Sequence, residues 1–340
     1  MNRIPLLPSL VVLTLVLLAL CLTSLSSGVM NLPLSQALLA IGDHLFGASV
    51  SSLKAHEQAV VWELRLPRTA LAVFAGIMLS QCGAVMQGLF RNPLADPGVI
   101  GVSSGAAVGA VLAIFFSPQS MVWWTVPVSA FSGGFACSLF IYRLAHSNLG
   151  TSILVLLLAG IAVSAFSFSI IGLLSYLSDD SRLRDLTMWQ LGSLAGANAT
   201  EVWMSAVVAG VLSLRFQYRA SALNAMLLGE AEARHLGIDV ESLKRELIIL
   251  TALGVGLAVA CAGVISFIGL VVPHAVRTLN GPDHRSLLPL SALLGGTLLL
   301  CADIVARLAV QPAELPVGLL TALLGAPFFV MLLLQLKERA

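Results

Sequence analysis

Few side chains in this 340-residue chain have the types and spacing needed for chemistry. Each of its three lysines follows a leucine, so the chain has no P-loop with which to bind ATP. It has no HExxH motif, and its five cysteines lie singly in apolar runs, which is typical of small core residues rather than of a zinc site or a disulfide framework. The sequence therefore predicts no catalytic residue, no metal site and no cofactor bound by this chain.

Asp303 and Arg307 are spaced four residues apart and can pair on one face of a helix, for a structural or a functional purpose. No series of Asp, Glu and His residues runs through the apolar segments, as a proton-coupled pump would require. A carrier without such a relay would take its energy from a partner.

The elements that position these residues must lie in a membrane. The chain is 58% hydrophobic and 10% charged, with a net charge of +1 and a mean hydropathy of +0.96, whereas a soluble domain carries about 25% charged residues. These values exclude a soluble enzyme, a disordered chain and a nucleic-acid-binding protein. The chain is therefore an integral membrane protein.

A spanning helix needs about 20 apolar residues, and the stretches between charged residues predict an all-α polytopic protein with ten transmembrane helices. The segment 268–280 is short and contains Pro273, His274 and Arg277, which favours a half-helix buried in protein. The first segment is interpreted as a retained helix rather than a signal peptide. The ten segments are 8–27, 69–90, 98–116, 122–143, 152–177, 200–214, 246–266, 268–280, 286–308 and 315–336.

The loop cations predict the orientation. With the N-terminus in the cytoplasm, twelve of the 18 Lys and Arg residues lie inside and six outside, which favours two cytoplasmic termini. Arg65, Arg68 and Arg307 depart from this rule because they lie at outer helix ends.

The only long polar stretch, 215–246, has equal numbers of acids and bases. Leu223, Leu227 and Leu228 fall on one helical face, and Gly229 and Gly237 delimit two short amphipathic helices. Such helices lie in the headgroup plane or dock onto a protein, and the balanced charge favours protein docking.

Several short motifs in fixed order over residues 65–328 resemble the FecCD permeases of binding-protein-dependent ABC importers, which include vitamin B12, siderophore and haem permeases. They are Arg65-Leu-Pro-Arg68, Gly83 to Gly88, Asn92 to Pro97 with Gly101 and Gly105-Ala106, Trp189 with Gly192-Ser193-Leu194, Leu228-Gly229, Gly263 to Gly269, Pro273-His274 with Arg277, His284-Arg285, Glu314 to Gly318 and Gly325 to Phe328.

The resemblance implies a type II ABC importer permease fold, with residues 1–340 as a single transmembrane domain of a homodimer. It further implies a periplasmic binding protein outside, two ATPase subunits inside that hold ATP and Mg²⁺, and a bacterial inner-membrane location. The chain itself would be a transport subunit without an ATPase site.

The resemblance also assigns roles to residues. As exposed charges, Arg65, Arg68 and Arg307 would receive acidic residues of the binding protein, the alternative being arginines that snorkel at helix ends. A cytoplasmic gate maps onto Asn92, Leu94, Thr151 and Ser152, which could equally be loop and cap residues. ATPase coupling maps onto the segment 220–243, with Leu223, Leu227, Leu228, Gly229, Glu230, Glu232, Arg234 and Leu236.

For the cargo, general similarity favours haem, followed by an Fe(III)-siderophore and cobalamin. His274 and His284 are possible haem contacts because imidazole is a natural ligand of haem iron. His274, however, belongs to a Pro-His pattern that also resembles permeases for iron-free cargo, which favours a structural role. Two other classes are an ion-coupled secondary carrier, for which midplane ionisable residues are missing, and a membrane-embedded enzyme, for which no clustered nucleophile or metal set is found.

Overall fold

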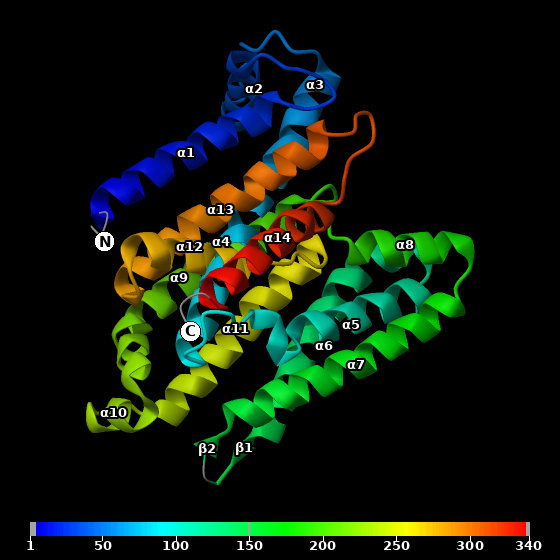
Figure 1. Ribbon diagram of the computed structural model, residues 1–340. Coiled ribbons are helices and arrows are strands. Elements are labelled where there is room, and N and C mark those ends of the chain that lie inside the picture. Colours follow the sequence, from blue (N-terminus) through cyan, green and yellow to red (C-terminus); the bar gives the residue numbers. More distant parts are fainter. Residues whose placement is uncertain (1–4, 149, 338–340) are drawn as a thin grey trace.

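Helices make up most of the described chain, as Figure 1 shows. The computed structural model describes residues 5–148 and 150–337, apart from the side chains of residues 119, 333 and 335–337. Each of the ten predicted segments overlaps a helix, although the bounds differ most at 200–214 and 246–266. They are α1 (Leu6–Ser26), α4 (Leu66–Leu89), α5 (Val102–Phe116), α6 (Val122–Ala145), α7 (Ile153–Tyr176), α9 (Ala199–Leu228), α11 (Val240–Ala262), α12 (Ile268–Asn280), α13 (His284–Leu308) and α14 (Val317–Lys337).

Seven helices in the described residues are long and apolar enough to cross a membrane, namely α1, the continuous stretch Ala55–Leu89 that ends in α4, α6, α7, α9, α11 and α13. Apolar helical stretches of 10–17 residues are α5 and, within α14, the part Val317–Leu332. The short α12 has its Ile268, Val272 and Val276 buried in the protein, in agreement with the predicted half-helix. The all-α membrane fold is confirmed, whereas the count of ten spans is not.

The shorter elements gather at the ends of the long helices. Figure 1 shows α2 and α3 at one end and α10 with the β-hairpin at the other. The lengths of the apolar stretches predicted neither α2 nor α8, because both helices are shorter than the about 20 residues that a spanning helix needs. These elements are α2 (Leu34–Phe46), α3 (Ala55–Ala59), the π-helical turn Val60–Arg65, the 3₁₀ turns Pro97–Ile100 and Gln119–Met121, α8 (Asp180–Gln190), α10 (Glu230–His235), β1 (His146–Ser147) and β2 (Gly150–Thr151).

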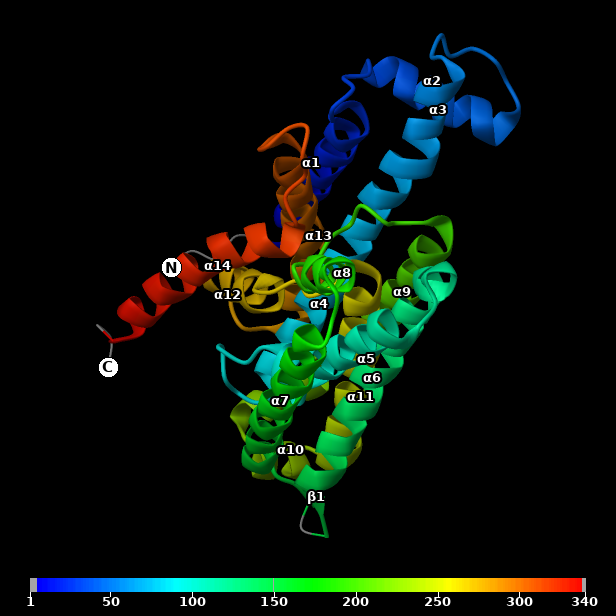
Figure 2. The same ribbon diagram turned by 90° about the vertical axis from the view of Figure 1, so that its right-hand side faces the viewer.

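The core lies around α4, which packs against α9, α11, α12 and α13. Glycines set the close approach: a Cβ atom on Gly83 would lie 1.8 Å from the carbonyl oxygen of Gly269, and one on Gly76 would lie 2.3 Å from that of Gly295. Small residues at such crossings let helix backbones touch. Figure 2 shows α5, α6 and α7 grouped beside this core, with α1 on the opposite side against α13.

The polar stretch 215–246 folds differently from the prediction. α9 does not end at residue 214 but continues to Leu228, because Glu246 pairs with Arg219 at 2.6 Å and also with Arg215. The two predicted short helices are therefore the last turns of α9 and a single separate helix, α10. Gly229, at φ 131°, forms the bend between them.

The terminal helices have their free ends on the same side. Asn280, at the end of α12, donates to Ser9 near the start of α1 at 3.4 Å, and α13 then begins beside the end of α9. α14 starts next to Gly192, just after α8, so it begins at the opposite end. The start of α1 and the end of α14 on the α10 side agree with the predicted arrangement, and the orientation in the membrane remains a prediction.

Candidate functional site

The first candidate region, here called the arginine cluster, comprises Arg65, Arg68, Asp303, Arg307 and Glu314. Arg68 lies between two acids: its guanidinium is 2.9 Å from the Asp303 carboxylate and 2.6 Å from that of Glu314. Arg307, one helical turn after Asp303, pairs with the same carboxylate at 3.1 Å. Asp303 is fully buried. The four-residue spacing therefore gives an ion pair, with Arg68 as a second cation.

Arg65 and Arg307 reach across to the end of α1. Arg65 donates to the carbonyl oxygen of Leu25 at 2.7 Å and also to those of Ser26 and Met30. Arg307 donates to the hydroxyl of Ser24 at 2.7 Å. Because helix C-termini leave carbonyl oxygens without partners, these arginines stabilise the end of α1.

The expectation that these three arginines are exposed is wrong for this structure. Arg65, Arg68 and Arg307 are 5%, 9% and 5% exposed, because their donors are taken up by acids and carbonyl groups of the same chain. The most accessible acid of the cluster is Glu314, whose side chain is 39% exposed. Docking of a binding protein here stays a prediction.

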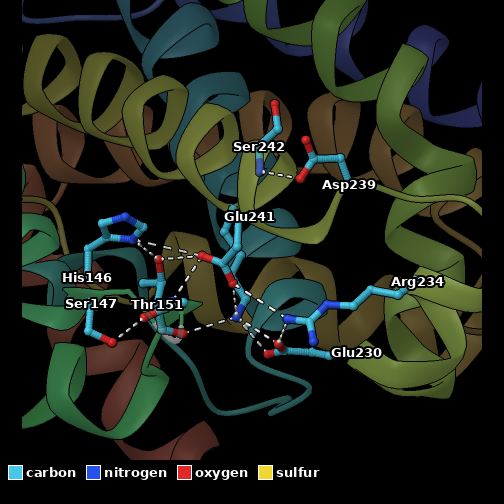
Figure 3. A network of polar contacts seen from close by, with 10 residues as sticks. His146, Ser147, Thr151, Glu230, Arg234, Asp239, Glu241 and Ser242 are labelled. Carbon is cyan, nitrogen blue, oxygen red and sulfur yellow. Dashed lines mark hydrogen bonds and ion pairs between the residues drawn. The ribbon is translucent and has the colours of Figure 1, made fainter.

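The second candidate region, here called the lysine network, comprises His146, Thr151, Glu230, Arg234, Glu241 and Lys244 at the α10 end (Figure 3). Lys244 lies on α11 with a side chain only 2% exposed, and its ammonium is 2.8 Å from the Glu230 carboxylate. It also donates to the carbonyl oxygen of Thr151 at 3.0 Å. One buried cation thus joins α10, α11 and the hairpin.

The predicted coupling residues divide into a buried and an exposed group. Leu223 is fully buried in the core, and the Glu230 carboxylate faces Lys244. Leu227, Leu228 and Leu236 are 38%, 66% and 63% exposed. Of the predicted coupling residues, the exposed ones, available for contact with a partner, are Leu227, Leu228, Glu232, Arg234 and Leu236.

The predicted gate residues lie on two loops. Asn92 is exposed and its side-chain oxygen accepts from the backbone N–H of Leu94 at 2.9 Å. Ser152 is the N-cap of α7. Thr151, in contrast, is buried in the lysine network. The cap alternative therefore describes Asn92 and Ser152 well, and the gate role stays a prediction.

The two histidines are packed against protein. His284 is fully buried; its Nδ1 is 2.9 Å from the Asn224 side-chain oxygen, and a Cβ atom on Gly88 would lie 2.4 Å from its Nε2. His274 is partly buried and its ring meets that of Phe328 edge-on, with centroids 6.2 Å apart. A haem contact at His284 would require this packing to open. The described residues contain no group of three or more His, Cys, Asp or Glu that could hold a metal ion.

Two acidic residues in loops, Asp283 and Asp96, have shifted pKa values. The backbone N–H of Arg285, donating at 3.0 Å, holds the pKa of Asp283 below its usual range, and the Asn224 amide adds to this effect at 2.6 Å. Burial raises the pKa of Asp96, although its carboxylate accepts from the N–H of Gly98 at 2.7 Å. Asp283 therefore joins the end of α9 to the start of α13 through Asn224.

Sequence reasoning missed Lys244 and Glu241. A signal was present, because Val240, Leu243, Leu247 and Ile248 follow the spacing of a buried helical face and Lys244 falls on that face. A lysine at such a position is costly to bury unless it is paired. The pattern therefore predicts that the Lys244 ammonium is paired with acidic side chains inside the protein rather than exposed to solvent.

The fold agrees with comparisons to known proteins. The model of the FecCD transport family matches residues 15–335. The chain belongs to the FecCD transport family. It is 47% identical over 290 residues to the hemin transport system permease protein HmuU of Yersinia pestis, covering 82% of this chain and 84% of that protein. It is 40% identical over 319 residues to the vitamin B12 import system permease protein BtuC of Salmonella paratyphi A, covering 94% of each.

A solved structure described as an inward-facing conformation of a metal-chelate type ABC transporter aligns with a TM-score of 0.83 and 34% identity, covering 96% of this chain and 98% of that chain. This FecCD chain is thus the permease subunit of an ABC importer. Membership implies ATPase and binding-protein partners and dimer formation, and its bacterial relatives imply the inner membrane.

Proposed function

We propose that this FecCD permease moves haem from a periplasmic binding protein to the cytoplasm, driven by ATP hydrolysis in separate ATPase subunits. The observation that carries the choice of cargo is the 47% identity to a hemin permease over 82% of the chain, against 40% to a vitamin B12 permease. An Fe(III)-siderophore is the second candidate, favoured by the likeness to a metal-chelate type transporter at a TM-score of 0.83. Cobalamin is the third.

In this proposal the α10 end faces the cytoplasm and binds the ATPase. The support is local: Leu228 and Leu236 are 66% and 63% exposed on either side of α10, and exposed apolar side chains with flanking charges are typical of docking surfaces. Both chain termini are cytoplasmic in this orientation, as the loop cations favour.

Two copies of the chain form the pathway as a homodimer, with Asn92, Leu94, Thr151 and Ser152 at its cytoplasmic gate. At the other end, Arg65, Arg68 and Arg307 meet acidic residues of the binding protein. Because all three are engaged internally, docking there requires the incoming acids to compete with, or add to, the existing partners.

The test is uptake into proteoliposomes that contain the permease with its cognate ATPase and binding protein. Haemin, a ferric siderophore and cobalamin are supplied separately, with ATP or a non-hydrolysable analogue inside. The proposal predicts ATP-dependent uptake of haemin above that of the other two. Import of the siderophore but not haemin would overturn the cargo, and uptake without ATP would overturn the mechanism.

A further inference from the structure

The ammonium group of Lys244 is fully engaged by three separate elements. A lysine side chain has three N–H donors, and those of Lys244 are matched by the Thr151 carbonyl oxygen at 3.0 Å, the Glu230 carboxylate at 2.8 Å and the Glu241 carboxylate at 3.3 Å. The side chain is 2% exposed. Its three contacts therefore hold the hairpin, α10 and α11 in one fixed arrangement.

Glu241 adds a second link between α11 and the hairpin. Its carboxylate accepts from both the backbone N–H and the hydroxyl of Thr151, at 2.9 and 2.8 Å, as Figure 3 shows. The preceding Gly150, at φ 108°, leaves no room for a side chain, because a Cβ atom there would lie 2.8 Å from Glu241. The hairpin is thus seated directly on the start of α11.

Glu230 supplies the link to α10, of which it is the first residue. Gly229 separates α10 from α9, and residues 236–239 join the other end of α10 to α11, so the contact between Glu230 and Lys244 adds a side-chain link between α10 and α11. Arg234, one turn later, lies 3.7 Å from Glu230 and 3.9 Å from Glu241. A movement of α10 therefore pulls on the cation that holds Thr151.

We propose that Lys244 is a positioning residue that transmits movement of α10 to the hairpin and to Thr151, so that ATPase action at α10 reaches the gate. The inference rests on the proposed function, in which α10 contacts the ATPase and Thr151 belongs to the gate. A contiguous set of ionic contacts around a buried cation is a physical route for such coupling, and it requires that these contacts take up a second arrangement when the ATPase acts.

Lys244→Met tests this link, with Glu230→Gln as a milder variant that keeps the lysine. Arg245→Met is the matched control, because Arg245 is the next residue of the same helix and has an exposed side chain. ATP hydrolysis and haemin uptake are measured in the same proteoliposomes of the full complex. We expect Lys244→Met to retain stimulated hydrolysis and to lower the haemin imported per ATP by about tenfold. Arg245→Met is expected to match the wild type.

A second readout does not depend on the cargo. Hydrogen–deuterium exchange at the amide of Thr151, which donates to Glu241, is expected to be faster in Lys244→Met and in Glu230→Gln than in Arg245→Met. The proposed role of Lys244 is wrong if haemin uptake and ATP hydrolysis fall in parallel in Lys244→Met. It is also wrong if both the haemin imported per ATP and the exchange rate at Thr151 match those of Arg245→Met. If the wild-type complex shows no ATP-dependent uptake, the proposed function fails, and the exchange experiment alone decides whether Lys244 holds the hairpin.

Discussion

The arginine cluster and the lysine network both hold charged side chains inside the protein, but their carboxylates differ in exposure. In the first, Asp303 is fully buried and the Arg68 side chain is 11% exposed, and the contacts brace the ends of α1, α4 and α13. In the second, Lys244 is equally buried but its carboxylate partners Glu230 and Glu241 are 27% and 30% exposed. Both carboxylates of the second region are partly hydrated, whereas in the first only Glu314 is, and the central Asp303 is dry. Because partly hydrated partners can be exchanged for water at lower cost, we expect the first region to stay fixed and the second to rearrange.

The largest expected effect is that of Asp303→Asn, because it removes the shared carboxylate of two buried arginines. Leaving buried charges without a partner costs roughly 3–5 kcal/mol of folding free energy. The measurement is the thermal unfolding midpoint of the purified permease. Glu314→Gln is the control, expected to cost less than about 1 kcal/mol because its side chain is 39% exposed. Equal shifts of the unfolding midpoint in the two variants would contradict the larger role of the buried Asp303 compared with the exposed Glu314.

Lys244→Met is expected to destabilise the chain less than Asp303→Asn. The two carboxylates it leaves behind are partly hydrated, so the loss is about 1–3 kcal/mol. The thermal unfolding midpoint again measures the loss. Arg245→Met is the control and is expected to stay within about 0.5 kcal/mol of the wild type. A loss as large as that of Asp303→Asn would show that the two regions do not differ in kind.

Arg65→Gln distinguishes a docking role from a purely internal one. Arg65 binds carbonyl oxygens of α1 and its following loop rather than an acid, so its charge is not neutralised by a neighbouring carboxylate. If it also receives the binding protein, the association rate falls severalfold at low salt and the difference shrinks at high salt. Surface plasmon resonance against the binding protein measures this. A wild-type rate at both salt concentrations would leave Arg65 with its structural role alone.

Arg234→Gln is expected to have the smallest effect on the free energy of unfolding. Its contacts to Glu230 and Glu241 are long and its side chain is 55% exposed, which corresponds to about 0.5 kcal/mol or less. Removing Glu232 and Arg234 together is nevertheless expected to weaken co-purification of the ATPase, because both are exposed and lie on α10 between the exposed leucines. Undiminished co-purification would remove these two residues from the docking surface.

The sequence predicted the helices well where apolar length decides, and it predicted the helix break at Gly229. It failed at residues whose role depends on tertiary partners. Arg215 and Arg219 indicated the end of a span, but Glu246 on a neighbouring helix lets α9 continue past them. Arg68 and Arg307 looked like exposed helix-end cations because no local pattern reveals that Asp303 and Glu314 surround them. The pairing partners of Arg68 are more than 230 residues away in the chain.

The most direct test of the contrast is hydrogen–deuterium exchange of the assembled complex in its nucleotide-free and vanadate-trapped states. Movement carried from α10 predicts altered exchange at Thr151 and in α10. The loop at Ser27 and Met30, held by Arg307 and Arg65, is expected to stay unchanged. Altered exchange at Ser27 and Met30 with none at Thr151 would contradict the account.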